Sequence, residues 1–168
     1  MTETSGKPGK LNLFTFLGTA FGIGFIPVMP GTIGTLAAAF VYLSIPETWL
    51  NNPPQLLYTI AAIIVMYFLG VYITGKAEET LGHDAGSIIL DEFVAYFICV
   101  LFLPKSLAMA AYTFAIFRVF DIAKPQPIRL TQNLKKGWGV MTDDVVAAVF
   151  TNLFMQAMIR IYPKFFVY

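Results

Sequence analysis

The sequence predicts an all-α integral membrane protein, a helical bundle of about four to five crossings whose polar motifs gather at one membrane face. The chain is 57% hydrophobic and only 12% charged, whereas soluble domains carry about 25% charged residues. Its apolar runs are continuous rather than alternating, which favours helices over the strands of a membrane barrel. The length of 168 residues suggests a single domain over residues 11–168, preceded by a polar tail over residues 1–10.

The first three apolar runs differ in how well they suit a membrane crossing. Residues 14–26 contain several glycines, so we expect an interfacial or re-entrant piece rather than a straight helix. Residues 35–50 are shortened by Pro46, which predicts a bent or partial crossing. Residues 56–74 carry no charge and are long enough to span the bilayer.

The remaining runs complete the bundle. Residues 87–103 and 106–120 are shorter, and the brief link containing Pro104 predicts an antiparallel helical hairpin. Residues 145–162 form the last apolar run, which only Arg160 interrupts. We expect this run to cross the membrane as well.

Alternate threading of these segments places the polar loops 75–86 and 122–142 on one face, together with every acidic cluster. The basic residues assigned to that face are Lys7, Lys10, Lys76, Lys124, Arg129, Lys135 and Lys136. Because positive charge marks the cytoplasmic side of a membrane protein, we expect the acidic clusters to face the cytoplasm.

Composition also excludes several classes of function. A net charge of +1 argues against a nucleic-acid partner, which would require a strongly basic patch. A single cysteine, Cys99, excludes an internal disulfide and makes a zinc cluster implausible. The N-terminus lacks the pattern of a cleaved signal peptide, and no obligate protein partner is evident from the sequence.

The first acidic cluster is the pair Asp91-Glu92, which follows the segment from His83 to Ser87. Adjacent carboxylates on a helix diverge by about 100°, so one can bind a metal while the other binds a second ion or a water. The alternative is a solvated helix start, where acids favour the helix dipole. His83 is the only histidine of the chain; it is either a loop residue or a ligand.

The second cluster is Arg118, Asp121 and Lys124, spaced so that each neighbouring pair shares a helix face. It is either an ion pair that anchors a helix end, or a metal ligand beside two cations that bind an anionic headgroup. The third cluster is Asp143-Asp144, preceded by Thr142. If Thr142 caps the helix, both acids fall in its first turn, and they then act either as capping charges or as ligands.

A glycine- and threonine-rich block precedes the second apolar run. It contains Pro30, Gly31, Thr32, Gly34 and Thr35. Such a block can expose backbone N–H groups and hydroxyls at a helix N-terminus and so bind an anion. A flexible break between two crossings explains the glycines nearly as well.

The residues therefore favour carboxylate-bound Mg²⁺ or Mn²⁺, hard ions that prefer oxygen ligands. The candidate catalytic and metal-binding residues are Asp91, Glu92, Asp121, Asp143 and Asp144, with Asp84 as a further ligand. The rival class is a transporter or channel, whose acids would carry cations or protons near the membrane midplane.

The chain resembles the phosphatidylglycerophosphatase A family of bacterial membrane phosphatases over residues 21–148. Four ordered blocks carry the resemblance: GFIPVMPGTIGTLAA, HDAGSIILDEF, FRVFDIAKPQPI and GWGVMTDD. The resemblance implies an all-helical enzyme of the bacterial inner membrane that removes the terminal phosphate of phosphatidylglycerol phosphate, with Mg²⁺, to yield phosphatidylglycerol. Its substrate would be an anionic phospholipid.

Under this interpretation, one or two metal ions activate a water or assist a phospho-aspartate, and Asp144 or Glu92 serves as the base. The residues expected to bind the substrate phosphate are Arg118, Lys124, Pro30, Gly31, Thr32, Gly34, Thr35, His83 and Ser87. The chain departs from the family pattern at Ala95 and Ala148, where glycine is common, and at Lys136-Gly137, where Gly-Gly is common.

Overall fold

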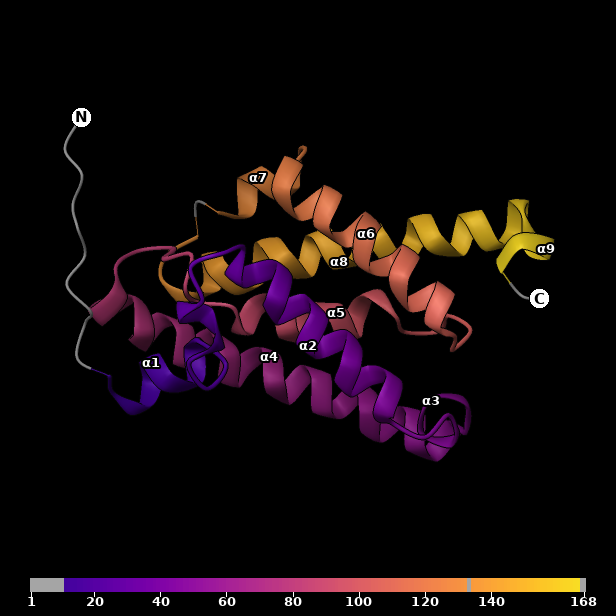
Figure 1. The fold of residues 1–168 in the computed structure, drawn as a ribbon, viewed down its shortest axis with the longest axis horizontal. Coiled ribbons are helices and arrows are strands. Elements are labelled where there is room, and N and C mark those ends of the chain that lie inside the picture. Colours follow the sequence, from indigo (N-terminus) through magenta and orange to yellow (C-terminus); the bar gives the residue numbers. More distant parts are fainter. Residues whose placement is uncertain (1–10, 133, 167–168) are drawn as a thin grey trace.

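The computed structural model describes residues 11–132 and 134–166, and these residues form a bundle of helices (Figure 1). The expected polar tail over residues 1–10 lies outside the described residues. The helices are α1 (Leu13–Gly18), the 3-10 helix η1 (Ile23–Phe25), α2 (Pro30–Ser44), α3 (Thr48–Asn51), α4 (Pro53–Leu81), α5 (Leu90–Cys99), α6 (Leu107–Ala123), α7 (Ile128–Thr131), α8 (Gly137–Ile161) and α9 (Pro163–Phe166). The all-α prediction is confirmed for these residues.

Two helices of the described chain, α4 and α8, are long and apolar enough to cross a membrane. Exposed α4 side chains include Leu57, Val65, Phe68 and Tyr72, each more than half exposed. A helix on a soluble protein turns polar side chains outward, so this surface suits lipid. The two helices thus indicate membrane association.

Helix α8 begins at Gly137, earlier than the sequence predicted, so the expected cap at Thr142 is wrong. Gly137 packs directly against α4, where a Cβ atom would overlap the Val71 carbonyl oxygen. The Thr142 hydroxyl lies inside the helix and shares a 2.8 Å hydrogen bond with the Tyr67 hydroxyl. Asp143 and Asp144 consequently lie past the first turn of α8.

The residue before α8 also explains a departure from the family pattern. Lys136 has φ 56° and ψ −150°, a conformation that glycine adopts far more readily than other residues. The glycine that the resemblance leads us to expect at this position would adopt the same conformation with less strain. The other two departures, Ala95 and Ala148, are fully buried in the core.

Helix α5 is much shorter than the run 87–103 from which it was predicted. Its ten residues rise only about 15 Å, half the hydrocarbon thickness of a bilayer. The segment before it is irregular because it packs against the N-terminal piece: the Ile89 amide donates to the Gly18 carbonyl at 3.0 Å. The N-terminal run is itself broken into α1 and η1, as its glycines predicted.

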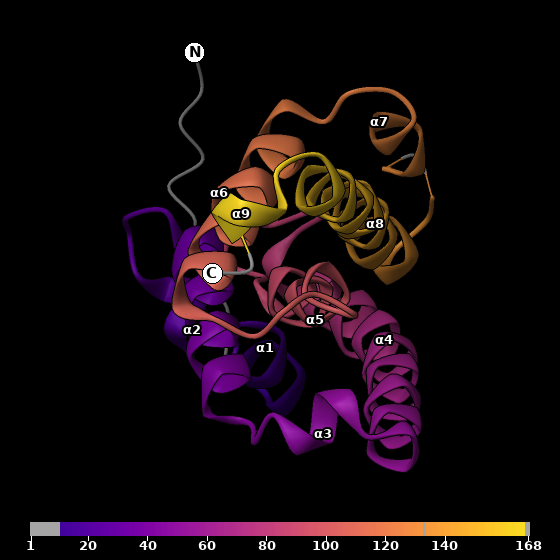
Figure 2. The same ribbon diagram turned by 90° about the vertical axis from the view of Figure 1, so that its right-hand side faces the viewer.

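Helix α5 lies in the middle of the bundle, surrounded by α2, α4, α6 and α8 (Figure 2). Its Tyr96 side chain is fully buried and donates a hydrogen bond to the Ala110 carbonyl at 2.8 Å. At the far end of the hairpin, Lys105 bonds to the carbonyls of Leu43 and Ile45, at the end of α2. This pairing fixes the direction of each helix, so α2, α5 and α8 start and α6 ends toward the same end of the bundle, at the left of Figure 1.

Candidate active site

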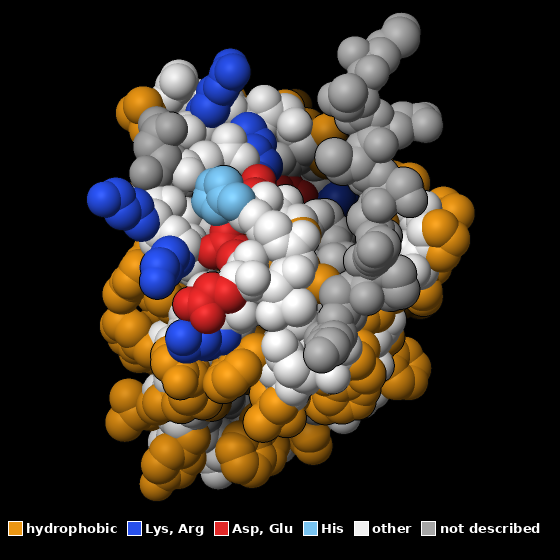
Figure 3. Space-filling model, turned by 90° about the vertical axis from the view of Figure 1, so that its left-hand side faces the viewer, with side chains coloured by type: hydrophobic (Ala, Val, Ile, Leu, Met, Phe, Trp, Pro, Cys, Tyr) orange, Lys and Arg blue, Asp and Glu red, His pale blue; other side chains and the backbone are white. Residues whose placement is uncertain are grey.

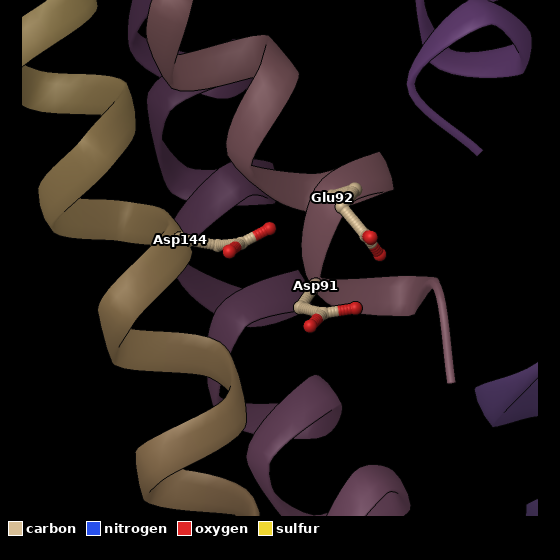
Figure 4. A group of neighbouring side chains, drawn as sticks. All are labelled: Asp91, Glu92 and Asp144. Atoms are coloured by element: carbon tan, nitrogen blue, oxygen red, sulfur yellow. The ribbon is translucent and has the colours of Figure 1, made fainter. Parts of the chain in front are cut away.

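Three carboxylates from two helices converge at this end of the bundle. Asp91 and Glu92 come from the first turn of α5, and Asp144 reaches toward them from α8 (Figure 4). One oxygen from each residue lies within 4.8 Å of the others. Asp91 and Asp144 are buried, with exposed fractions of 8% and 2%. We refer to Asp91, Glu92 and Asp144 as the three-acid cluster.

The three-acid cluster has unsatisfied oxygens. Asp91 Oδ1, Glu92 Oε2 and Asp144 Oδ2 are buried and have no hydrogen-bond partner. Burying an ionised carboxylate without a partner is strongly unfavourable, and buried charges normally pair or bind metals. Oxygen-only donors of this kind are what Mg²⁺ and Mn²⁺ prefer. The residues present therefore fit a hard divalent cation.

The other two predicted acids are paired with cations instead. Asp121 accepts a hydrogen bond from Arg118 Nη1 at 2.7 Å, and Asp143 accepts one from Lys124 Nζ at 2.5 Å. Lys124 also lies 3.9 Å from the Asp121 carboxylate. Asp121 and Asp143 therefore orient two cations beside the three-acid cluster.

Arg118 connects the two groups of acids. Its Nη1 atom lies 3.7 Å from Glu92 Oε1, and the side chain is largely buried. Its Nε atom is buried without a hydrogen-bond partner. A guanidinium group with an unused donor beside a buried acidic cluster is well suited to bind a phosphoryl oxygen.

Lys124 is held in its charged form by the surrounding acids. Burial would lower its pKa, but the hydrogen bond to Asp143 and the charges of Asp143, Asp144 and Asp121 raise the pKa of Lys124 well above its ordinary value. The residue ends α6 with φ 41°, in the left-handed region, which bends its backbone away from the helix. Lys124 therefore supplies a permanent positive charge to the site.

The glycine- and threonine-rich block reaches the site through its first residues. A Cβ atom at Gly31 would overlap the Glu92 carboxylate and lie 3.3 Å from Arg118 Nη1. The neighbouring Thr32 hydroxyl is buried and has no hydrogen-bond partner. The start of α2, including Pro30, therefore lies against both the acids and the arginine.

The later residues of the block have packing roles. Gly34 lies against the Ile89 side chain, where a Cβ atom would approach within 3.0 Å. The Thr35 hydroxyl is buried and donates to the Gly31 carbonyl at 2.9 Å inside α2. These contacts support the local helix, so Gly34 and Thr35 contribute to the site through backbone placement.

The turn that contains His83 and Asp84 stands at the entrance to the site. Both residues line a polar pocket of about 180 Å³, together with Gln132, Gly139, Val140 and Asp143. Asp84 is thus near Asp143 and outside the three-acid cluster. Ser87 follows this turn in the sequence, and its carbonyl oxygen packs closely against Gly24.

Glu78 is a residue of this region that the sequence reasoning missed. The sequence predicts a polar loop over residues 75–86, whereas α4 continues through Leu81. Its side chain is only 6% exposed and contacts His83. The available signal was helical spacing, because Glu78 follows the buried residues Gly70, Val71 and Thr74 on the same face.

Charged side chains gather on the end of the molecule where these motifs meet. Figure 3 views this end and shows basic side chains, acidic side chains and the histidine close together, with apolar side chains below them. A membrane-associated helical bundle with buried carboxylates and cations gathered at one end defines the class of protein to which this chain belongs. That arrangement differs from the midplane acids expected of a transporter.

Comparisons identify the family within that class. The phosphatidylglycerophosphatase A family matches residues 16–159 of this chain. The chain belongs to this family and is a lipid phosphate phosphatase of that type. This finding confirms the resemblance of the four sequence blocks. No solved structure matches the chain.

Three relatives cover most of the chain. A phosphatidylglycerophosphatase A of Haemophilus influenzae is 37% identical over 163 residues, covering 94% of this chain and 97% of the relative. A phosphatidylglycerophosphatase A of Escherichia coli is 39% identical over 142 residues, covering 82% and 78%. A protein of Bacteroides thetaiotaomicron, provisionally named a phosphatidylinositol-3-phosphatase, is 39% identical over 139 residues, covering 80% and 86%.

Proposed function

We propose that this protein hydrolyses phosphatidylglycerol phosphate to phosphatidylglycerol and inorganic phosphate in phospholipid biosynthesis, using Mg²⁺ or Mn²⁺. The observation that carries the proposal is the set of unpartnered, buried oxygens on Asp91, Glu92 and Asp144 beside Arg118. Two relatives named phosphatidylglycerophosphatase A support the choice of substrate.

The residues of the site divide into two groups by their contacts. The three-acid cluster would hold the metal, which when bound supplies polarisation of the phosphoryl oxygens and a more acidic water. Arg118 and Lys124 would bind the phosphoryl oxygens and stabilise negative charge in the transition state. Asp121 and Asp143 hold these two cations in place. Further metal ligation by Asp121, Asp143 and Asp84 stays a prediction from the sequence.

Proton transfer falls to the acids nearest the reacting group. Glu92 lies between Asp91 and Arg118, and Asp144 faces both acids of α5. Either carboxylate is placed to accept the proton of an attacking water, as general base catalysis requires. In the alternative route, Asp91 or Asp144 would attack phosphorus while the bond from phosphorus to the lipid oxygen breaks, and water would then hydrolyse the phospho-aspartate to release phosphate.

Phosphate release from defined lipids tests the proposed activity. Purified protein in detergent should release phosphate from phosphatidylglycerol phosphate in the presence of Mg²⁺ and lose this activity in EDTA, because the three-acid cluster requires a cation. Phosphatidylinositol 3-phosphate should be hydrolysed more slowly. A preference for the inositol lipid would refute phosphatidylglycerol phosphate as the substrate. Phosphate release that persists in EDTA would refute the requirement for a metal ion.

We propose that α2, α4, α6 and α8 cross the bacterial cytoplasmic membrane, that α5 with its irregular flanks forms a partial fifth crossing, and that the site faces the cytoplasm. The support is the contact of Lys105 with the end of α2, which puts the α5–α6 link opposite the acidic residues. The basic residues Lys76, Lys124, Arg129, Lys135 and Lys136, in the loops predicted to lie at the acidic end, agree with cytoplasmic placement.

Cysteine labelling tests this topology. In a Cys99→Ala background, Gly86→Cys should be labelled only from the cytoplasm and Asn52→Cys only from outside. Gly86 is a suitable position because a Cβ atom there meets nothing within 4 Å. Asn52 is exposed at the start of α4. Labelling of both positions from one side would overturn the threading.

A further inference from the structure

Glu78 is a buried acid that the proposed reaction does not use. It lies in the last turn of α4, and its side chain is only 6% exposed. Acidic residues on the last turn of a helix oppose the helix dipole, and a buried carboxylate is costly unless it is paired. Both effects indicate that the groups in contact with Glu78 compensate the cost of placing a buried acid there.

Those contacts all go to one turn. Glu78 Oε1 lies 2.6 Å from His83 Nδ1 and accepts a hydrogen bond from the Asp84 backbone N–H at 3.0 Å. Asp84 has φ 50°, in the left-handed region that is uncommon for residues other than glycine, although aspartate adopts it more readily than most. A single carboxylate oxygen therefore fixes both the histidine ring and an uncommon backbone conformation next to it.

The turn that Glu78 holds forms part of the polar pocket. His83, Asp84 and Asp143 line that pocket, and Asp143 is bonded to Lys124. Because Nδ1 of His83 is engaged by Glu78, Nε2 is the ring atom left to bind a ligand. The pocket therefore has His83 and Asp143 in its lining, and Asp143 connects it to the cation Lys124.

We propose that Glu78 is a positioning residue that holds His83 and Asp84 so that the His83 imidazole binds the polar headgroup of the phospholipid phosphate. This inference rests on the proposed function of the site. It adds a specific chemistry, in which a carboxylate orients a histidine and the histidine contacts substrate. The binding is made equally to the ground state and the transition state, so its loss affects KM more than kcat.

Kinetics of three variants test the role. Glu78→Gln and His83→Gln should each raise KM roughly tenfold, the scale of one hydrogen bond to a charged group, while kcat changes less than about threefold. The double variant should be no worse than either single variant, because both remove the same contact. Glu79→Gln is the matched control, since Glu79 is half exposed and pairs with Lys76 on the surface.

A spectroscopic measurement tests the contact independently of activity. His83 is the only histidine, so protein labelled with ¹⁵N-histidine gives one pair of ring signals. The wild type should show a hydrogen-bonded Nδ1, and this signature should disappear in Glu78→Gln but persist in Glu79→Gln. If the wild type shows this signature but releases no phosphate from the lipid, the proposed function is refuted and the contact between Glu78 and His83 is still supported.

Three outcomes would overturn the inference. One is an unchanged KM in His83→Gln, a variant of an exposed side chain that should fold even if Glu78→Gln does not. The other is an additive effect in the double variant, which would show that Glu78 acts on stability separately from His83. A fall in melting temperature of Glu78→Gln with unchanged KM would likewise assign Glu78 a purely structural role.

Discussion

Asp91→Asn and Asp144→Asn should each lower kcat by at least about two orders of magnitude, roughly 2.7 kcal/mol of transition-state free energy. Both substitutions keep the side-chain volume and remove one of the three charges that would bind the metal. The oxygens concerned are buried and unpartnered, so each substitution removes a donor that the bound metal would use. The measurement is initial phosphate release across a range of Mg²⁺ concentrations.

The melting temperature separates loss of the metal from loss of the fold. In EDTA, each variant should melt at or above the temperature of the wild type, because it relieves repulsion among crowded carboxylates. The wild type should gain stability with Mg²⁺, and the variants should lose that gain. Near-normal turnover in both variants would contradict a metal site built on the three-acid cluster.

The two paired acids should behave differently from the cluster. Asp121→Asn and Asp143→Asn leave Arg118 and Lys124 without their closest partners. Turnover of each variant should fall by at least about a hundredfold, because the cation that has lost its partner no longer stabilises the transition state. Stabilisation by Mg²⁺ should remain. If these variants also lose it, Asp121 and Asp143 are metal ligands, as the sequence alone suggested.

The second large effect is expected at Gly31. Gly31→Val should lower kcat/KM by about a hundredfold or more, because even the Cβ atom overlaps the Glu92 carboxylate and approaches Arg118. The glutamate must then move out of the three-acid cluster, and displacement of a reacting group by about 1 Å can cost a hundredfold in rate. Steady-state kinetics and Mg²⁺ activation measure the effect.

Two other glycines provide matched controls. Gly86→Ala should leave activity and stability unchanged, since its Cβ atom meets nothing within 4 Å. Gly34→Val should lower the melting temperature instead, because it collides with the buried Ile89 in the packing between α2 and the start of α5. Full activity of a folded Gly31→Val protein would remove the start of α2 from the site.

The sequence predicted the gathering of the acids because each cluster stood at the end of an apolar run. Alternate threading of those runs sends the starts of α5 and α8 to one end, and that result needs no side-chain detail. The start of α8 could not be predicted from the segment Gly137-Trp138-Gly139, because its two glycines lower helix propensity. Close packing of Gly137 on α4 overrides that propensity.

The division of the acids into metal-facing and cation-paired groups could not be predicted from spacing. The Arg118–Asp121 pair was evident as an i, i+3 neighbour, but the contact of Lys124 with Asp143 joins residues on separate helices. Glu78 was missed for a related reason. Its burial depends on how far α4 extends, and the sequence run ended at the first charged residue.

The position of Asp144 within α8 sets how deep in the protein a lipid phosphate must bind. The residue follows the helix start at Gly137 by about 10 Å at the rise of an α-helix. In the proposed topology the start of α8 lies near the membrane surface, so a lipid phosphate would have to reach about that far below the surface to meet Asp144. Selection among lipid phosphates can thus depend on how far the phosphate stands from the glycerol backbone, whatever the acyl chains.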